Sequence, residues 1–171
     1  MKPQPNEYPQ SEYTSRYINL VPEDNAIDVL RQKEVWQLVH TLSEEQSTYR
    51  YAEGKWSIKE MLGHMIDTER IFTYRVLCIA RGEKQPLPGF DENLYTETAH
   101  FDSRTLVSLL AEYSAVRDAN LFLFDNLDET ALLQIGNANG KELSVRAILY
   151  MIAGHERHHI SILKERYLKI Q

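Results

Sequence analysis

A stretch of about twenty residues without regular apolar spacing separates two long helix-like segments of this chain. It covers residues 81–101 and contains Gly82, Pro86, Pro88 and Gly89. A connection of this length can run along a helix of roughly 35 Å, whereas a tight turn would force the two helices to be antiparallel. The sequence therefore predicts that the helices before and after this stretch are parallel.

Apolar residues at intervals of three and four positions, the spacing of one helix face, predict four helices. We expect them over residues 26–42, 57–80, 102–124 and 144–167. Ser57 lies three residues before Glu60 and predicts a capping box at the start of the second helix. Asp102 or Ser103 is expected to cap the third helix, and Ser144 the fourth.

The other segments are interpreted as connections. Residues 1–24 contain four prolines and three tyrosines, which predicts an extended arm that packs along the body. The sequence Gly-Asn-Ala-Asn-Gly at residues 136–140 tolerates a left-handed backbone and predicts a turn. No segment gives a convincing strand. The predicted fold class is therefore all-α, a four-helix bundle with an extended amino-terminal arm and a long crossover from the second to the third helix.

Size and charge limit the possible partners. The 171 residues suit one domain over residues 1–171. The chain has 19 Lys and Arg against 25 Asp and Glu, a net charge of −6, which disfavours nucleic-acid and membrane partners. A single cysteine, Cys78, excludes an intramolecular disulfide. Since no signal-peptide or membrane-spanning run is visible, we expect a cytoplasmic protein.

Two histidines of the fourth predicted helix lie within its apolar stripe. On a helical wheel, Ile148, His159 and Ile152 lie about 20°, 40° and 60° from His155. Buried imidazoles are costly unless their nitrogens have partners, and two histidines at positions i and i+4 can bind one divalent ion. The alternative is a pair of hydrogen-bonded core histidines.

A metal site needs a third ligand from another helix, and His64 is the best candidate. It lies seven residues after Ser57, roughly 10 Å along the axis, so it reaches the depth of the other two if the second and fourth helices are antiparallel. His64 lies off the centre of its apolar stripe, so a surface histidine is the alternative. Three histidines leave coordination positions open, as catalysis requires, and imidazole ligands suit Zn²⁺ or Ni²⁺. Asp67 is a further candidate, either as a ligand or beside one, with simple solvation as its alternative.

Glu156 is the candidate catalytic residue because it follows His155 and lies beside apolar residues instead of facing water. A half-buried glutamate next to a metal ligand can orient a water or a thiol as a base. A buried salt bridge to another helix, for instance with Arg75, is the alternative.

Two further residues are expected to lie outside the site. Cys78 is about 21 Å along the helix axis from His64 and is interpreted as a packing residue. His158 lies off the apolar stripe and is expected to be exposed near Glu165.

Two other metal motifs match only formally. Residues 155–159, His-Glu-Arg-His-His, fit the H-E-x-x-H pattern of zinc proteases, but only twelve residues follow and none is a histidine. Glu-x-x-His strings at residues 97–100 and 156–159 resemble part of a di-iron bundle site, but the first lies in the connection before the third helix. Both motifs are poor fits.

The residues assembled above resemble the DinB-like superfamily over about residues 26–168. They are KWSIKEMLGH at 55–64, Asp67, Glu69, Arg70, LSV at 143–145 and GHERHH at 154–159. Within it, the chain is most similar to the branch of YfiT-type metal-dependent hydrolases and bacillithiol transferases. The resemblance implies a four-helix bundle in down-up-up-down order, in agreement with the long connection. It also implies metal binding by His64, His155 and His159.

The reaction implied by this resemblance is attack by a metal-activated nucleophile, either a water or a small thiol. Thiol transfer of the bacillithiol type to small electrophiles is slightly preferred; a metal-dependent hydrolase and a non-catalytic, metal-stabilised interaction bundle are the alternatives. Generic candidates for holding an anionic thiol are Arg81, Lys84, Arg157 and Lys164. Residues 82–101 are expected to form one wall of the pocket, and the tyrosine-rich arm is consistent with a homodimer.

Overall fold

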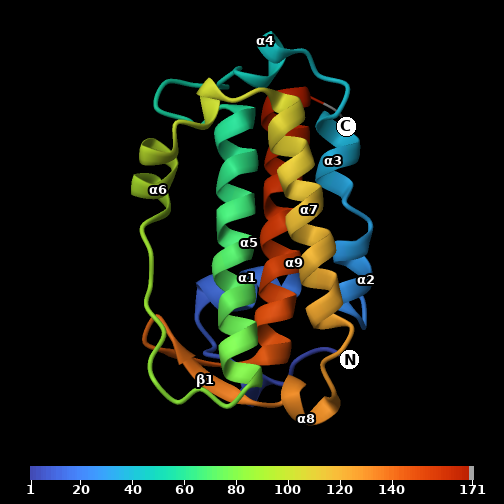
Figure 1. Ribbon diagram of the computed structural model, residues 1–171, viewed down its shortest axis with the longest axis vertical. Coiled ribbons are helices and arrows are strands. Elements are labelled where there is room, and N and C mark those ends of the chain that lie inside the picture. Colours follow the sequence, from blue (N-terminus) through green and yellow to red (C-terminus); the bar gives the residue numbers. More distant parts are fainter. Residues whose placement is uncertain (170–171) are drawn as a thin grey trace.

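Four long helical segments form the body of the protein (Figure 1). The structure is a computed structural model and describes residues 1–169. The body consists of α5 (Ile58–Ala80), α7 (Leu106–Phe124), α9 (Val145–Ile162) and a segment made of α2 (Ala26–Arg31) and α3 (Glu34–Val39). In Figure 1 the α2–α3 segment and α9 run upward, whereas α5 and α7 run downward. Viewed from the opposite end, this is the predicted bundle in down-up-up-down order.

The long crossover allows α5 and α7 to be parallel, as predicted. Between them the chain returns along the outside of the bundle (Figure 1) through α6 (Glu92–Ala99), capped by Asp91, and a 3-10 turn, η2 (Phe101–Ser103). The third bundle helix begins later than predicted, because Thr105 is its N-cap. Asp102 instead accepts hydrogen bonds from Arg50 and Ser57, which joins the crossover to the start of α5.

The helix predicted over residues 26–42 is interrupted at Lys33. This residue adopts a left-handed backbone, with φ of 48°, between α2 and α3. Its ammonium group lies 2.7 Å from Asp118 of α7, so an ion pair ties the break to the neighbouring helix. A short helix, α4 (Glu44–Ser47), follows at the end of the bundle.

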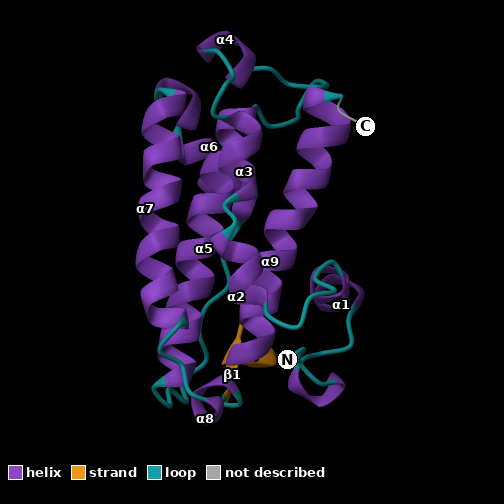
Figure 2. Cartoon of the chain, turned by 90° about the vertical axis from the view of Figure 1, so that its right-hand side faces the viewer, coloured by secondary structure: helices purple, strands orange, loops and turns teal. Residues whose placement is uncertain are grey.

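The amino-terminal arm is not wholly extended. It contains a 3-10 turn, η1 (Pro5–Glu7), and the helix α1 (Glu12–Asn19), whose N-cap is Ser11. The nearest prolines, Pro9 and Pro22, lie on either side of α1, so they bound the helix and do not break it. Figure 2 shows α1 beside α9, against which it packs.

The glycine- and asparagine-rich turn belongs to a β-hairpin that was not predicted. After α8 (Glu129–Leu132), strands β1 (Ile135–Ala138) and β2 (Lys141–Ser144) pair antiparallel. Asn139 and Gly140 connect them with φ values of 54° and 72°, as a tight two-residue hairpin turn requires. Four-residue strands alternate too briefly to give a sequence signal. The backbone of Leu87 in the crossover makes two hydrogen bonds to this hairpin, each 2.9 Å long.

A polar layer divides the core of the bundle into two apolar clusters. One cluster contains Phe72 and Ile148, and the other contains Met61 and Leu109. The buried polar residues of this layer are His64, Glu69, Arg117, His155, Glu156 and His159. Burying these polar side chains costs free energy unless each finds a hydrogen-bond, ion-pair or metal partner. Within residues 1–169, no helix is long and apolar enough to cross a membrane.

We expect Gly154→Ala to lower the free energy of unfolding by about 2 kcal/mol, because overpacking a tight contact costs that much. A Cβ atom at Gly154 would overlap the backbone carbonyl of Tyr17, so α1 would have to move away from α9. Urea denaturation measures the change. Ser161→Ala, on the exposed side of α9, is the control. Equal stability of both variants would contradict this close contact.

Candidate metal centre

Three histidine side chains meet between α5 and α9. Because these helices run in opposite directions, His64 of α5 lies level with His155 and His159, which are one turn apart on α9. The Nε2 atom of His155 is 2.9 Å from Nε2 of His64 and 3.1 Å from Nε2 of His159. Each side chain is only 6% or 7% exposed. The structure thus brings together the three histidines singled out in the sequence.

The spacing of these nitrogens fits one divalent ion. Two nitrogens bonded to the same ion at about 2.1 Å are about 3.0–3.4 Å apart when the bond angle is between about 90° and 110°. The two short Nε2 separations are close to this range, and the three ligand atoms all lie within 4.8 Å of one another. Among residues 1–169, this is the one group of three or more potential ligands that is close enough to share an ion.

Burial keeps the three imidazoles neutral. Burial, with a smaller contribution from the charge of His158, lowers the pKa of His64 to about 4. Burial also lowers the pKa of His155 and of His159 well below the ordinary value, and neighbouring histidines add to the effect. A neutral imidazole offers the lone pair that a metal ion requires.

The cluster is not a fully hydrogen-bonded group of core histidines. Within the described chain, Nδ1 of buried His159 has no hydrogen-bond partner, and Nδ1 of His64 reaches only Oγ1 of Thr68, at 3.5 Å. Buried polar atoms in native proteins almost always have partners. An imidazole nitrogen carries either one proton or one lone pair, so Nε2 of His155 cannot form good hydrogen bonds to both neighbouring Nε2 atoms. The three converging Nε2 atoms therefore fit a metal site better than a hydrogen-bonded core, which was the alternative for His155 and His159.

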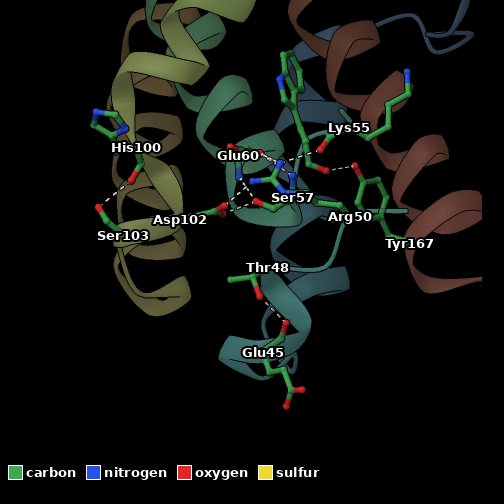
Figure 3. Close-up of polar contacts among 11 residues, drawn as sticks. Glu45, Thr48, Arg50, Lys55, Ser57, Glu60, His100, Asp102, Ser103 and Tyr167 are labelled. Atoms are coloured by element: carbon green, nitrogen blue, oxygen red, sulfur yellow. Dashed lines mark hydrogen bonds and ion pairs between the residues drawn. The ribbon is translucent and has the colours of Figure 1, made fainter. Parts of the chain in front are cut away.

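The indole ring of Trp56 covers the imidazole of His64, and contacts at the start of α5 fix the position of Trp56. The two ring centroids are 4.6 Å apart, with an angle of 40° between the planes. Figure 3 shows Ser57, Glu60 and Tyr167 at this end of α5. The hydroxyl of Tyr167 donates to the carbonyl oxygen of Trp56 over 2.6 Å, and the Ser57–Glu60 capping box closes the helix end. The predicted capping box therefore also positions an aromatic side chain of the site.

A cavity of about 210 Å³ opens above the histidine cluster. Its floor consists of the three histidines and Thr68, and its walls contain Tyr13, Tyr17, Trp56, Phe90, Glu92 and His158. Phe90 and Glu92 come from the crossover, which agrees with the prediction that residues 82–101 form one wall. Tyr13 and Tyr17 come from α1 and were missed by the sequence reasoning. Their spacing of four residues places them on one helix face, which is the signal that could have identified them.

Glu156 is part of a buried ion network and does not join the histidine cluster. Its carboxylate accepts hydrogen bonds from Arg117 and, over 3.0 Å, from the hydroxyl of Tyr113. Arg117 also binds Glu69 with two hydrogen bonds of 2.9 and 2.7 Å. The structure thus shows the alternative of a buried interhelical salt bridge, although the partner is Arg117 and not Arg75. With both partners engaged, Glu156 is a poor candidate for a catalytic base.

Arg75 has other contacts. Its guanidinium donates a hydrogen bond to the carbonyl oxygen of Pro88 over 2.8 Å and lies 5.2 Å from the ring centroid of Phe72. This contact fastens the crossover to α5 below the cavity. Spacing along the sequence could not distinguish between Arg75 and Arg117 as partners, because the choice depends on how α5 and α7 pack against α9.

His158 is half-buried beside the cavity and is not exposed near Glu165 as predicted. Its Nδ1 lies 3.1 Å from a guanidinium nitrogen of Arg16, and its ring packs edge-on against Tyr17. Both contacts come from α1, which explains the error. Glu165 instead accepts a hydrogen bond from Ser161 over 2.7 Å.

Asp67 and Cys78 also lie outside the cluster. Asp67 is next to Arg70, with 3.6 Å between the charged atoms, and is not among the residues close enough to share the ion. Cys78 is a half-buried thiol packed at the edge of the core, which agrees with its interpretation as a packing residue.

None of the four basic residues proposed to hold an anionic thiol lines the cavity. Arg157 forms an ion pair with Glu23, and Lys164 forms one with Glu34 at 2.7 Å. Arg81 and Lys84 are exposed at the far end of α5. The walls of the cavity are aromatic, and their charged group is the acid Glu92.

Comparisons with known proteins point to one family. The sequence model of the DinB superfamily matches residues 28–163. A protein of Oceanobacillus iheyensis named a putative metal-dependent hydrolase is 25% identical over 132 residues, which are 75% of this chain and 74% of that protein. The solved structure of YfiT from Bacillus subtilis, described as a probable metal-dependent hydrolase with an unusual four-helix bundle topology, is similar with a TM-score of 0.75. That comparison has 16% identity and covers 99% of this chain and 94% of the other.

Proposed function

This chain belongs to the DinB superfamily, and on that basis we propose that it is a metal-dependent hydrolase of small molecules. The observation that carries the proposal is the convergence of three buried Nε2 atoms, from His64, His155 and His159, at the floor of a cavity. The relatives named as metal-dependent hydrolases support the same conclusion. Three imidazole ligands without a carboxylate favour Zn²⁺ or Ni²⁺.

The protein's own residues prepare the site for this chemistry. A bound divalent ion supplies a Lewis acid that polarises a substrate carbonyl and makes water more acidic. His64, His155 and His159 would hold the ion from two helices. Tyr17 and Trp56 shield two of these histidines from solvent by ring contacts. Such shielding strengthens electrostatic interactions at the floor of the cavity.

His158 supplies a hydrogen-bond donor beside the ligands. Because the guanidinium of Arg16 donates to Nδ1 of His158, the proton of the neutral imidazole is on Nε2. Burial and the charge of Arg16 lower the pKa of His158, which keeps the ring neutral at neutral pH. The ring can therefore donate a hydrogen bond through Nε2 to a substrate oxygen in the cavity.

Hydrolysis is favoured over the thiol transfer that the sequence slightly preferred. Basic side chains are the usual partners for the carboxylates or phosphates of an anionic thiol. The cavity walls contain Glu92 instead, and Arg157 and Lys164 are engaged in ion pairs elsewhere. Thiol transfer remains the second candidate, because a site with open coordination positions accepts either a water or a thiol.

We expect removal of the metal to abolish hydrolysis of activated esters and amides, and added Zn²⁺ or Ni²⁺ to restore it. The test uses protein purified without an affinity tag, treated with a chelator and then titrated with each ion. Parallel reactions with electrophiles and several low-molecular-weight thiols detect transferase activity. Hydrolysis that is insensitive to the chelator would contradict the proposal, and restored activity that requires a thiol would establish the transferase instead.

A further inference from the structure

The walls of the cavity contain four aromatic side chains and one carboxylate. Tyr13 and Tyr17 come from α1, Trp56 precedes α5, and Phe90 and Glu92 come from the crossover. Glu92 has no ion-pair or side-chain hydrogen-bond partner within residues 1–169, so its carboxylate is free to contact a ligand. The carboxylate is close enough to raise the pKa of both Tyr13 and Tyr17, although burial is the main cause in each case.

Exposure divides this cavity into a rim and a floor. Tyr13 is 49% exposed and Glu92 is also exposed, whereas Tyr17 and the three histidines are buried. A ligand that fills the cavity therefore has one end at an aromatic, acidic rim and the other end at the metal site. The volume of about 210 Å³ is below the ~300–1,000 Å³ of sites for drug-sized ligands, so the ligand is small.

Aromatic rings next to a carboxylate favour a positively charged group. The face of an aromatic ring attracts ammonium and guanidinium ions, and quaternary ammonium ligands are recognised by aromatic cages. The ring of Tyr13 already has such a contact, since Nζ of Lys141 lies 5.0 Å from its centroid. Among the described residues, Glu92 is the one Asp, Glu, Lys or Arg side chain that lines the cavity. The nearby cations do not pair with it: Arg16 is bonded to His158, Arg75 to the carbonyl oxygen of Pro88, and Lys141 lies on the Tyr13 ring.

We propose that this cavity binds a small organic cation, with an ammonium group held at the rim by Tyr13 and Glu92 and against the neighbouring ring of Tyr17. This inference rests on the proposed function and assigns a substrate class to the same site: small esters or amides that carry an amine or a quaternary ammonium group. The cleavable bond lies over the histidine cluster, and the cationic end lies at the rim. The acid also offsets part of the positive charge that a divalent ion brings to a site with three neutral ligands.

The test compares choline with 3,3-dimethylbutan-1-ol, a neutral molecule of the same shape. Binding is measured by the fluorescence of Trp56 in a Trp36→Phe background, because Trp36 is distant from the cavity and stacks on His40. We expect choline to bind about tenfold more tightly than the neutral molecule, which is the effect of a partly desolvated cation–π contact together with a carboxylate. Equal affinities, or tighter binding of the neutral molecule, would overturn the proposal.

Variants at the rim identify the responsible residues. Glu92→Gln and Tyr13→Leu should each weaken choline binding about threefold to tenfold and leave binding of 3,3-dimethylbutan-1-ol unchanged. Glu97→Gln, an exposed acid on the same helix outside the cavity wall, is the matched control and should bind choline normally. An unchanged choline affinity in Glu92→Gln would overturn the proposal that the carboxylate of Glu92 binds the ammonium group.

The same measurements separate this inference from the proposed function. Choline binding is measured both with the chelator and after loading with Zn²⁺, and the metal content of each sample is determined. Selective choline binding to metal-free protein that never takes up zinc would support the cation site and reject the metal site. Zinc uptake through the histidines without selectivity for choline would support the metal site and reject the cation site.

Discussion

Replacing His155 with alanine should remove bound metal almost completely and lower hydrolytic activity by about a thousandfold or more. His155 is the central residue of the cluster, since its Nε2 is within 3.1 Å of the Nε2 atoms of both His64 and His159. Its loss leaves only two ligands, on different helices. Elemental analysis of protein purified without a tag measures the metal, and the ester assay measures activity.

The matched control for this prediction is His40→Ala. His40 lies far from the cavity, where its ring is stacked on Trp36 with 4.3 Å between centroids. This variant should retain the metal content and the activity of the unmodified protein. Near-stoichiometric metal in His155→Ala would show that the three histidines are not the ligands, whatever the effect on activity.

Replacing Arg117 with methionine should lower the free energy of unfolding by about 3–5 kcal/mol, the cost of leaving buried charges without a partner. Arg117 is only 1% exposed and contacts the carboxylates of Glu69 and Glu156, which are also buried. It also donates to the backbone carbonyl of Leu30, so it joins α7 to α2 as well as to α5 and α9. Urea denaturation in the presence of a chelator measures the loss without a contribution from metal binding.

Two further variants show whether the unpaired carboxylates cause this loss. Adding Glu69→Gln and Glu156→Gln to Arg117→Met removes both charges and should recover at least half of the lost stability. Arg31→Met is the control, because its ion pair with Asp125 is exposed on both sides, and it should unfold almost as the unmodified protein does. Equal destabilisation by Arg31→Met and Arg117→Met would contradict the importance of the buried network.

Much of the bundle could be predicted because its signals are local. The capping box at Ser57 and the apolar spacing of α5, α7 and α9 depend on neighbouring residues, and the length of the connection before α7 determines that α5 and α7 are parallel. The break at Lys33 and the hairpin at Asn139 were missed. The break at Lys33 is accompanied by an ion pair with Asp118 of another helix, and the strands of the hairpin are too short to show a pattern of alternating residues.

The floor of the cavity could be predicted and its walls only in part. His64, His155 and His159 project from regular helices, where residue spacing determines direction. Tyr17 and His158 are brought together by the docking of α1 on α9, and no local pattern reports a contact between residues so far apart in the sequence. The partner of Glu156 was also misassigned, because helix packing selects Arg117 over Arg75.

The metal-binding residues and part of the cavity wall lie on different segments of the chain. The histidines lie on α5 and α9 inside the core, whereas Phe90 and Glu92 lie in residues 88–92, an exposed or half-buried part of the crossover. Substitutions in that segment can therefore alter ligand preference while the reactive centre stays intact. Related proteins are expected to diverge most in this stretch, and exchanging it between relatives offers a direct route to redesigned specificity.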